Sequence, residues 1–164
     1  MESNGANIKN KRETYGLVRR RQSNLFCMKQ IFVDSGLFKA FVDPNDTFHL
    51  QAKTFWKESI FSNAPLITTN YILDETFTLI RIKCNLERAL ELRNVLFYHE
   101  ANLQIERITV DDDAAAWEWF EKDWSKLSYT DCVSFAIMKR LELTDVATFD
   151  DHFTRAGFSV YPKK

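Results

Sequence analysis

Two aspartates stand at the ends of predicted buried strands. Asp34 follows the apolar run 31–33, and Asp150 follows the run 145–149. Open parallel sheets bind ligands outside the carboxyl ends of their strands, so both carboxylates would face one crevice if the two strands are neighbours. The alternative is that Asp34 only helps to cap the helix that follows it. Of the two adjacent acids at the second strand, we assign Asp150 to the crevice and expect Asp151 to point elsewhere.

Two further acids lie on predicted helices. Glu75 falls at the edge of the apolar face of a helix over 71–83, whereas Asp74 falls away from that face and should be solvated. Asp131 lies three residues after a serine, just before the apolar part of a predicted helix over 128–141. This spacing is typical of a capping box, so Asp131 can cap its helix and still point out of the helix end.

Four carboxylates that converge on one site repel one another unless a cation offsets their charge. Mg²⁺ and Mn²⁺ suit such a cluster because they prefer oxygen ligands and keep several bound waters. A metal ion in this setting can activate water and offset charge on a phosphoryl oxygen. The acids therefore predict the chemistry of nucleases and phosphatases.

Alternating strands and helices must position these acids. The hydrophobic pattern predicts strands at 31–33, 66–68, 103–110, 145–149 and 158–161, with helices between them at 37–42, 47–62, 71–83, 85–101, from 111 onward and at 128–141. This alternation predicts an α/β fold, in which helices cover both faces of a parallel sheet in a three-layer α/β/α sandwich.

Composition narrows the class of protein. The chain has 164 residues, a size that fits one domain, and a net charge of −1 that gives no overall basic signature for nucleic acid. Residues 1–27 carry six Lys and Arg against two Asp and Glu, so we interpret them as a basic, disordered tail before a domain over 28–164. Three cysteines without metal-type spacing and no apolar run of membrane length indicate a cytoplasmic protein with reduced thiols.

The segments around the four acids resemble the PIN domain family, and within it the VapC-type toxin ribonucleases. They are Ile-Phe-Val-Asp-Ser-Gly at 31–36, Thr-Thr-Asn-Tyr-Ile-Leu-Asp-Glu-Thr at 68–76, Thr-Asp-Cys-Val-Ser-Phe-Ala-Ile-Met at 130–138, and Ala-Thr-Phe-Asp-Asp-His-Phe at 147–153 with Ala-Gly-Phe at 156–158. The resemblance covers residues 28–162 and no acid of the pattern is missing. It implies a five-stranded parallel sheet in the order 3-2-1-4-5.

The resemblance also implies a function and a site. It implies cleavage of RNA that depends on Mg²⁺ or Mn²⁺, in the toxin of a type II pair that a small antitoxin silences, and we further expect a homodimer. The implied catalytic residues and metal ligands are Asp34, Glu75, Asp131 and Asp150, with Ser35 and Thr130 as hydrogen-bond donors around them.

Other residues of chemical interest are interpreted more simply. The acids 111–113 begin a helix, where solvated carboxylates favour the helix dipole. The three histidines lack the spacing of zinc ligands, and Cys132 is expected to be a small core residue rather than a nucleophile. The tryptophans 117, 119 and 124 are expected in the core or an interface, although they could stack on bases.

Two alternatives to a toxin remain open. One is a housekeeping PIN nuclease in RNA processing without an antitoxin, and the other is an inactive PIN domain that binds RNA or protein. The complete acid set argues against the second. A phospho-receiver domain and an Asp-x-Asp phosphatase are disfavoured, because Asp34 has no second acid next to it and is followed by Ser35 and Gly36.

Overall fold

The computed structural model describes residues 29–98 and 102–163. The predictions for residues 1–27, a basic tail that precedes the domain, lie outside the described residues. The elements, in chain order, are β1 (Ile31–Val33), α1 (Ser35–Val42), α2 (His49–Phe61), β2 (Leu66–Thr69), α3 (Asn70–Lys83), α4 (Leu86–Tyr98), β3 (Leu103–Glu106), α5 (Val110–Phe120), α6 (Tyr129–Arg140), β4 (Asp145–Ala147), α7 (Asp151–Arg155) and β5 (Ser159–Tyr161).

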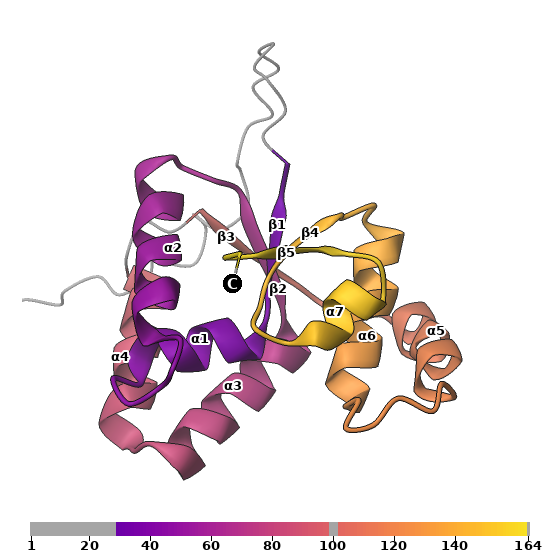
Figure 1. Cartoon of the computed structure of the whole chain (residues 1–164), viewed down its shortest axis with the longest axis horizontal. Helices are drawn as coiled ribbons and strands as arrows, with labels where there is room; N and C mark the ends of the chain where they lie inside the picture. The colour runs from indigo at the N-terminus through magenta and orange to yellow at the C-terminus, as the bar shows by residue number, and fades with distance from the viewer. Residues whose placement is uncertain (1–28, 99–101, 164) are drawn as a thin grey trace, which may run out of the picture.

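The strands form one parallel sheet in the order β3-β2-β1-β4-β5, which confirms the predicted fold class and strand order. β1 is central, with Phe32 opposite Ile67 of β2 and Val146 of β4. The helices of the first half, α1 to α4, cover one face of the sheet, and α5 to α7 cover the other (Figure 1). The order reverses at β1, so the carboxyl ends of β1 and β4 border a crevice of the kind that binds ligands in open α/β sheets.

Burial on both faces explains why the central strand is apolar. Phe32 and Val33 have no exposed surface, and neither has Val146 beside them. α6 is buried along most of its length, with residues 131–138 all in the interior. A buried sheet under two helix layers is a rigid platform for side chains at its edge.

The ends of several elements differ from the predictions by a few residues. β3 ends at Glu106 rather than at 110, and the helix predicted from 111 begins at Val110. β4 ends at Ala147, two residues before the predicted end, because the chain turns away from β5 after Thr148 donates its N–H to Tyr161. Within the part of the chain that the structure describes, no helix is long and apolar enough to cross a membrane.

Candidate active site

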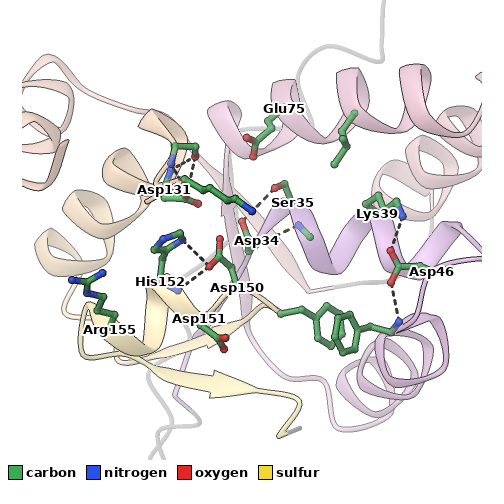
Figure 2. Close-up of a pocket in the computed structure, with 16 residues that line it drawn as sticks. Asp34, Ser35, Lys39, Asp46, Glu75, Asp131, Asp150, Asp151, His152 and Arg155 are labelled. Atoms are coloured by element: carbon green, nitrogen blue, oxygen red, sulfur yellow. Dashed lines mark hydrogen bonds and ion pairs between the residues drawn. The ribbon is translucent and has the colours of Figure 1, made fainter. Parts of the chain in front are cut away.

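The four predicted acids meet at the carboxyl edge of the sheet. Asp34, Glu75, Asp131 and Asp150 come from four separate segments and line one cavity of about 840 Å³. Figure 2 shows Glu75 above, Asp131 to the left and Asp34 and Asp150 in the centre of this cavity. The fold therefore brings together the acids that the sequence singled out, while their roles in catalysis and metal binding stay predictions.

Asp34 occupies the position between β1 and α1. Its side chain is 4% exposed and accepts a hydrogen bond of 2.7 Å from the Thr148 hydroxyl. The same carboxylate oxygen accepts a longer bond of 3.3 Å from the Gly36 N–H, so Asp34 caps α1 as well as facing the cavity. A Cβ on Gly36 would lie 3.3 Å from that oxygen, so the glycine leaves Asp34 room.

Asp150 reaches the cavity by a different route from the one that the sequence suggested. Thr148, not Asp150, directly follows the β4 strand as Asp34 follows β1. Asp150 lies two residues further on, where it caps α7 and accepts a 2.8 Å bond from the His152 N–H. What Asp34 and Asp150 share is therefore a helix N-cap and not a strand register. The Asp151 carboxylate points away from Asp34, although this exposed residue also borders the cavity (Figure 2).

Asp131 and Glu75 are positioned by their helices. Asp131 is in the first turn of α6 and forms the predicted capping box, in which its Oδ2 accepts bonds from the Ser128 N–H and hydroxyl at 2.9 and 2.8 Å. α3 begins where the Thr69 hydroxyl accepts the Ile72 N–H at 3.1 Å. One turn later, Glu75 is half-buried at the border of the core and Asp74 is exposed, as predicted.

The two predicted hydrogen-bond donors lie beside the acids. The Ser35 hydroxyl donates to Asp34 Oδ1 at 3.4 Å, and its side chain lies between Asp34 and Glu75 (Figure 2). Thr130 does not line this cavity but a second hollow, which it shares with Glu75. The hydroxyl that donates to Asp131 belongs to Ser128.

Burial and mutual repulsion make this site a poor environment for negative charge. The pKa of Asp34 is raised to about 7, first by burial and then by the charges of Asp131 and Glu75, against the hydrogen bond from Thr148. Burial also raises the pKa of Glu75, with added repulsion from Asp131 and Asp150. The pKa of Asp131 is raised by burial and by the charge of Asp150, although its bonds to Ser128 act in the opposite direction. Such a site gains most from a bound cation.

Three basic residues, Lys39, Lys126 and Arg155, border the cavity, and the first of them forms ion pairs with nearby aspartates. Lys39 Nζ forms ion pairs with Asp43 at 2.8 Å and Asp46 at 2.6 Å. Lys126 and Arg155 line the cavity wall. The positive charges of these two side chains at the edge of the acidic cavity are suited to binding phosphate groups.

Sequence reasoning missed two residues of the site. Thr148 is fully buried, donates to Asp34 and accepts the Asp150 N–H at 3.0 Å, so one hydroxyl holds two acids. His152 places a ring nitrogen near one carboxylate oxygen each of Asp131 and Asp150, all within 4.8 Å of one another. The sequence signals for these residues were a threonine near the end of a strand, Thr148, and the run Asp-Asp-His at 150–152. Neither signal predicts which side chains come into contact unless the fold is known.

Two predictions about residues outside the acid set, for Cys132 and Asp112, have different outcomes. Cys132 is buried, and burial raises the pKa of its thiol to about 11, which agrees with a core residue rather than a nucleophile. The prediction that all three acids 111–113 are solvated is wrong for Asp112, which is 2% exposed. Asp112 closes a capping box with Thr109 and accepts a 2.6 Å bond from Arg140 Nε of the packed helix α6.

The tryptophans divide between the core and the surface. Trp119 and Trp124 are partly buried against the main core, and both rings contact Phe135. Trp117 is 53% exposed and forms an aromatic cluster with Phe120 of α5 and Tyr129 of α6.

Comparisons with known proteins agree with this geometry. Residues 31–159 match the family described as PIN domain. Over 130 residues the chain is 32% identical to the 23S rRNA-specific endonuclease VapC20 of Mycobacterium tuberculosis, a match that covers 78% of this chain and 95% of the relative. The crystal structure of M. tuberculosis VapC20, described as a Sarcin-Ricin loop cleaving toxin, superposes with a TM-score of 0.68 at 31% identity, over 78% of this chain and 95% of that one.

A more distant structure shares only the fold. FitAcB from Neisseria gonorrhoeae superposes with a TM-score of 0.58 at 15% identity, over 80% of this chain and 96% of that one.

Proposed function

The chain belongs to the PIN domain family, and we propose that it is an endoribonuclease that hydrolyses RNA phosphodiester bonds with Mg²⁺ or Mn²⁺. The observation that carries this proposal is the convergence of four carboxylates from four segments on one cavity at the carboxyl edge of the sheet. Three of these acids have a raised pKa because they are buried and repel one another. Hard carboxylate oxygens under mutual repulsion are the donor set that a hard divalent cation fits.

Each acid has a proposed role in this reaction. Asp34, Glu75, Asp131 and Asp150 hold the metal, which when bound activates a water and offsets charge on the phosphoryl oxygens. Ser35 and Ser128 donate hydrogen bonds that orient Asp34 and Asp131, and Thr130 is proposed as a further donor to Glu75, with which it shares a second hollow. Lys126 and Arg155, on the cavity wall, hold phosphates of the RNA on either side of the cleaved bond.

The relative at 32% identity supports a narrower proposal for substrate and partners. Because VapC20 is a 23S rRNA-specific endonuclease, we propose structured ribosomal RNA as the first substrate to test. We also propose that the chain is the toxin of a type II pair, acts in the cytoplasm as a homodimer and is neutralised by a small antitoxin. A housekeeping nuclease would cleave RNA without such an antitoxin, and an inactive domain would only bind RNA or protein.

The test is an assay of RNA cleavage by the purified protein. Ribosomes and isolated 23S rRNA are incubated with the wild type, with Asp34→Asn and with Asp111→Asn, in Mn²⁺, Mg²⁺ or chelator. Asp111 is exposed on α5 and does not line the cavity, so it is the matched control. We expect metal-dependent cleavage that falls by at least about 100-fold in Asp34→Asn and is unchanged in Asp111→Asn. Cleavage in chelator, or full activity of Asp34→Asn, would contradict the proposal.

A further inference from the structure

The ring of His152 is held in the arrangement of a metal-binding imidazole. Its Nε2 lies 3.0 Å from the Ser125 carbonyl oxygen, which can only accept, so Nε2 carries the ring proton. A metal-ligating histidine usually donates its other ring N–H to such a carbonyl, which fixes the tautomer and the ring plane. When the ring is neutral, the opposite nitrogen, Nδ1, carries the lone pair.

Nδ1 of His152 faces the acids without a satisfactory partner of its own. It is buried and lies 2.9 Å from Asp150 Oδ1, yet it makes no well-directed hydrogen bond to any atom in the described part of the chain. Two ligands at right angles on an ion with bonds of about 2.1 Å lie about 3 Å apart, so this separation suits neighbouring ligands. One ring nitrogen of His152 and an oxygen each of Asp131 and Asp150 also lie within 4.8 Å of one another.

Aromatic packing restrains the imidazole in this position. The Trp124 ring is nearly parallel to that of His152, at an interplanar angle of 8° and a centroid distance of 6.3 Å. The Arg155 guanidinium lies 4.2 Å from the centroid of the same tryptophan. Figure 2 shows His152 beside Asp131 and Asp150, with its ring toward the cavity.

We propose that His152 is a fifth ligand, which binds the metal through Nδ1 beside Asp131 and Asp150 and shifts the preference of the site from Mg²⁺ toward Mn²⁺. The reason for the shift is that Mg²⁺ favours an all-oxygen shell, whereas imidazole nitrogen suits transition ions better. This inference rests on the metal site of the proposed function. The competing interpretation is that His152 is only a protonated partner of Asp150, in which case no nitrogen touches the ion.

Mn²⁺ itself is the probe, because its electron spin senses directly bound nitrogen. Binding is followed by loss of the free-ion electron paramagnetic resonance signal, and bound ¹⁴N by electron spin echo modulation. We compare the wild type, His152→Gln and His49→Gln, and measure Mg²⁺ by competition. His49 is the matched control, because it also contacts a backbone carbonyl, that of Ala40 at 2.8 Å, but does not line the cavity.

We expect ¹⁴N modulation in the wild type and in His49→Gln and its loss in His152→Gln. Loss of a residue that only supports a metal ligand typically raises the Kd by roughly 10-fold or more. We therefore expect the Kd for Mn²⁺ to rise in His152→Gln by at least this factor, and the Kd for Mg²⁺ to rise less. Wild-type protein made with ¹⁵N-labelled histidine gives the same test without any change in folding, because a histidine ligand replaces the ¹⁴N pattern with that of ¹⁵N.

The possible failures separate the two proposals. Tight Mn²⁺ binding without nitrogen modulation, or modulation that ¹⁵N-histidine leaves unchanged, overturns the role of His152 and leaves the carboxylate site standing. Modulation that survives in His152→Gln also overturns it. Absence of Mn²⁺ binding in folded wild-type protein overturns the inference and the proposed metal-dependent nuclease together.

Discussion

Asp34 combines almost complete burial with two acidic neighbours. Because its pKa rises from 3.8 to about 7, the folded chain without metal keeps a proton that the unfolded chain releases, so stability falls as pH rises between these values. Asp34→Asn removes this cost and keeps a helix-capping side chain. Without metal at pH 7.5 we expect the variant to be more stable than the wild type, by as much as about 4 kcal/mol.

The check is urea unfolding of wild type and Asp34→Asn, each in chelator, at pH 4 and pH 7.5. The difference in free energy of unfolding should be small at pH 4 and large at pH 7.5. A variant that is less stable than the wild type by the same amount at both pH values would show that Asp34 is a structural residue without electrostatic strain.

Adjacent acids at the start of α7 allow a matched comparison. Asp150 points toward Asp34, whereas the Asp151 carboxylate points away (Figure 2). We expect Asp150→Asn to lower RNA cleavage by at least about 100-fold, and Asp151→Asn to lower it by less than about 10-fold. Both variants keep a capping side chain at position 150, so their melting temperatures should differ little. Similar losses of activity in the two would mean that the site includes both acids.

At the scale of elements, Thr148 at the carboxyl end of β4 links two acids of the site by hydrogen bonds. The Thr148 hydroxyl donates to Asp34 at 2.7 Å and accepts the Asp150 N–H at 3.0 Å. Thr148→Val keeps the shape and removes both bonds, so we expect metal affinity and cleavage to fall by roughly 10- to 100-fold. Leaving buried polar groups unpaired should also cost about 1–3 kcal/mol of stability.

The control for this variant is Thr68→Val on β2. Thr68 is equally buried and its hydroxyl donates to the Val33 carbonyl at 2.8 Å, but it contacts no acid of the site. We therefore expect a comparable loss of stability with much less loss of metal affinity, as measured by thermal unfolding and by calorimetric titration with Mn²⁺. If both variants bind metal equally well, Thr148 is only a packing residue.

The order of the long elements could be predicted from the sequence because each has a clear hydrophobic period, whereas the five-residue helix α7 was not predicted because it is too short to show one. The end of β4 could not be predicted, because Thr148 and Phe149 have side chains that suit a strand, and only pairing with the neighbouring strands shows that the ladder stops at Ala147. Asp150 was assigned correctly to the cavity, but from a false equivalence in strand register. Its actual position follows from capping α7.

The acids of α5 show a second limit. Local sequence predicts that carboxylates favour a helix start, and Asp112 is indeed in the first turn of α5. Its burial depends on Arg140, 28 residues later, which reaches it only because α5 packs on α6. Contacts between residues that are distant in sequence, such as those of Thr148 with Asp34 and of His152 with Asp131, can be identified only from the fold.

For the molecule as a whole, the parallel sheet gathers the acids at one edge, and their repulsion there makes the stability of the protein depend on pH and on bound metal. All four acids approach the cavity at the carboxyl edge, and three have a raised pKa. A raised pKa in the folded state makes the metal-free protein lose stability as pH rises toward that pKa. A divalent cation binds the ionised acids of the native state only, so it should restore this stability at neutral pH and have little effect in acid.

We expect Mn²⁺ at about 100 times its Kd to raise the melting temperature by roughly 5 to 10 °C at pH 7.5, because binding then adds about 2.7 kcal/mol. At pH 5 the raised pKa of Asp34 keeps it protonated, so the shift should be much smaller. Differential scanning fluorimetry of the wild type and of Asp34→Asn/Glu75→Gln, with and without Mn²⁺, measures both effects. A wild-type melting temperature at pH 7.5 that ignores the metal would argue against a carboxylate metal site. An equal shift in the double variant would mean that Asp34 and Glu75 do not hold the ion that stabilises the fold.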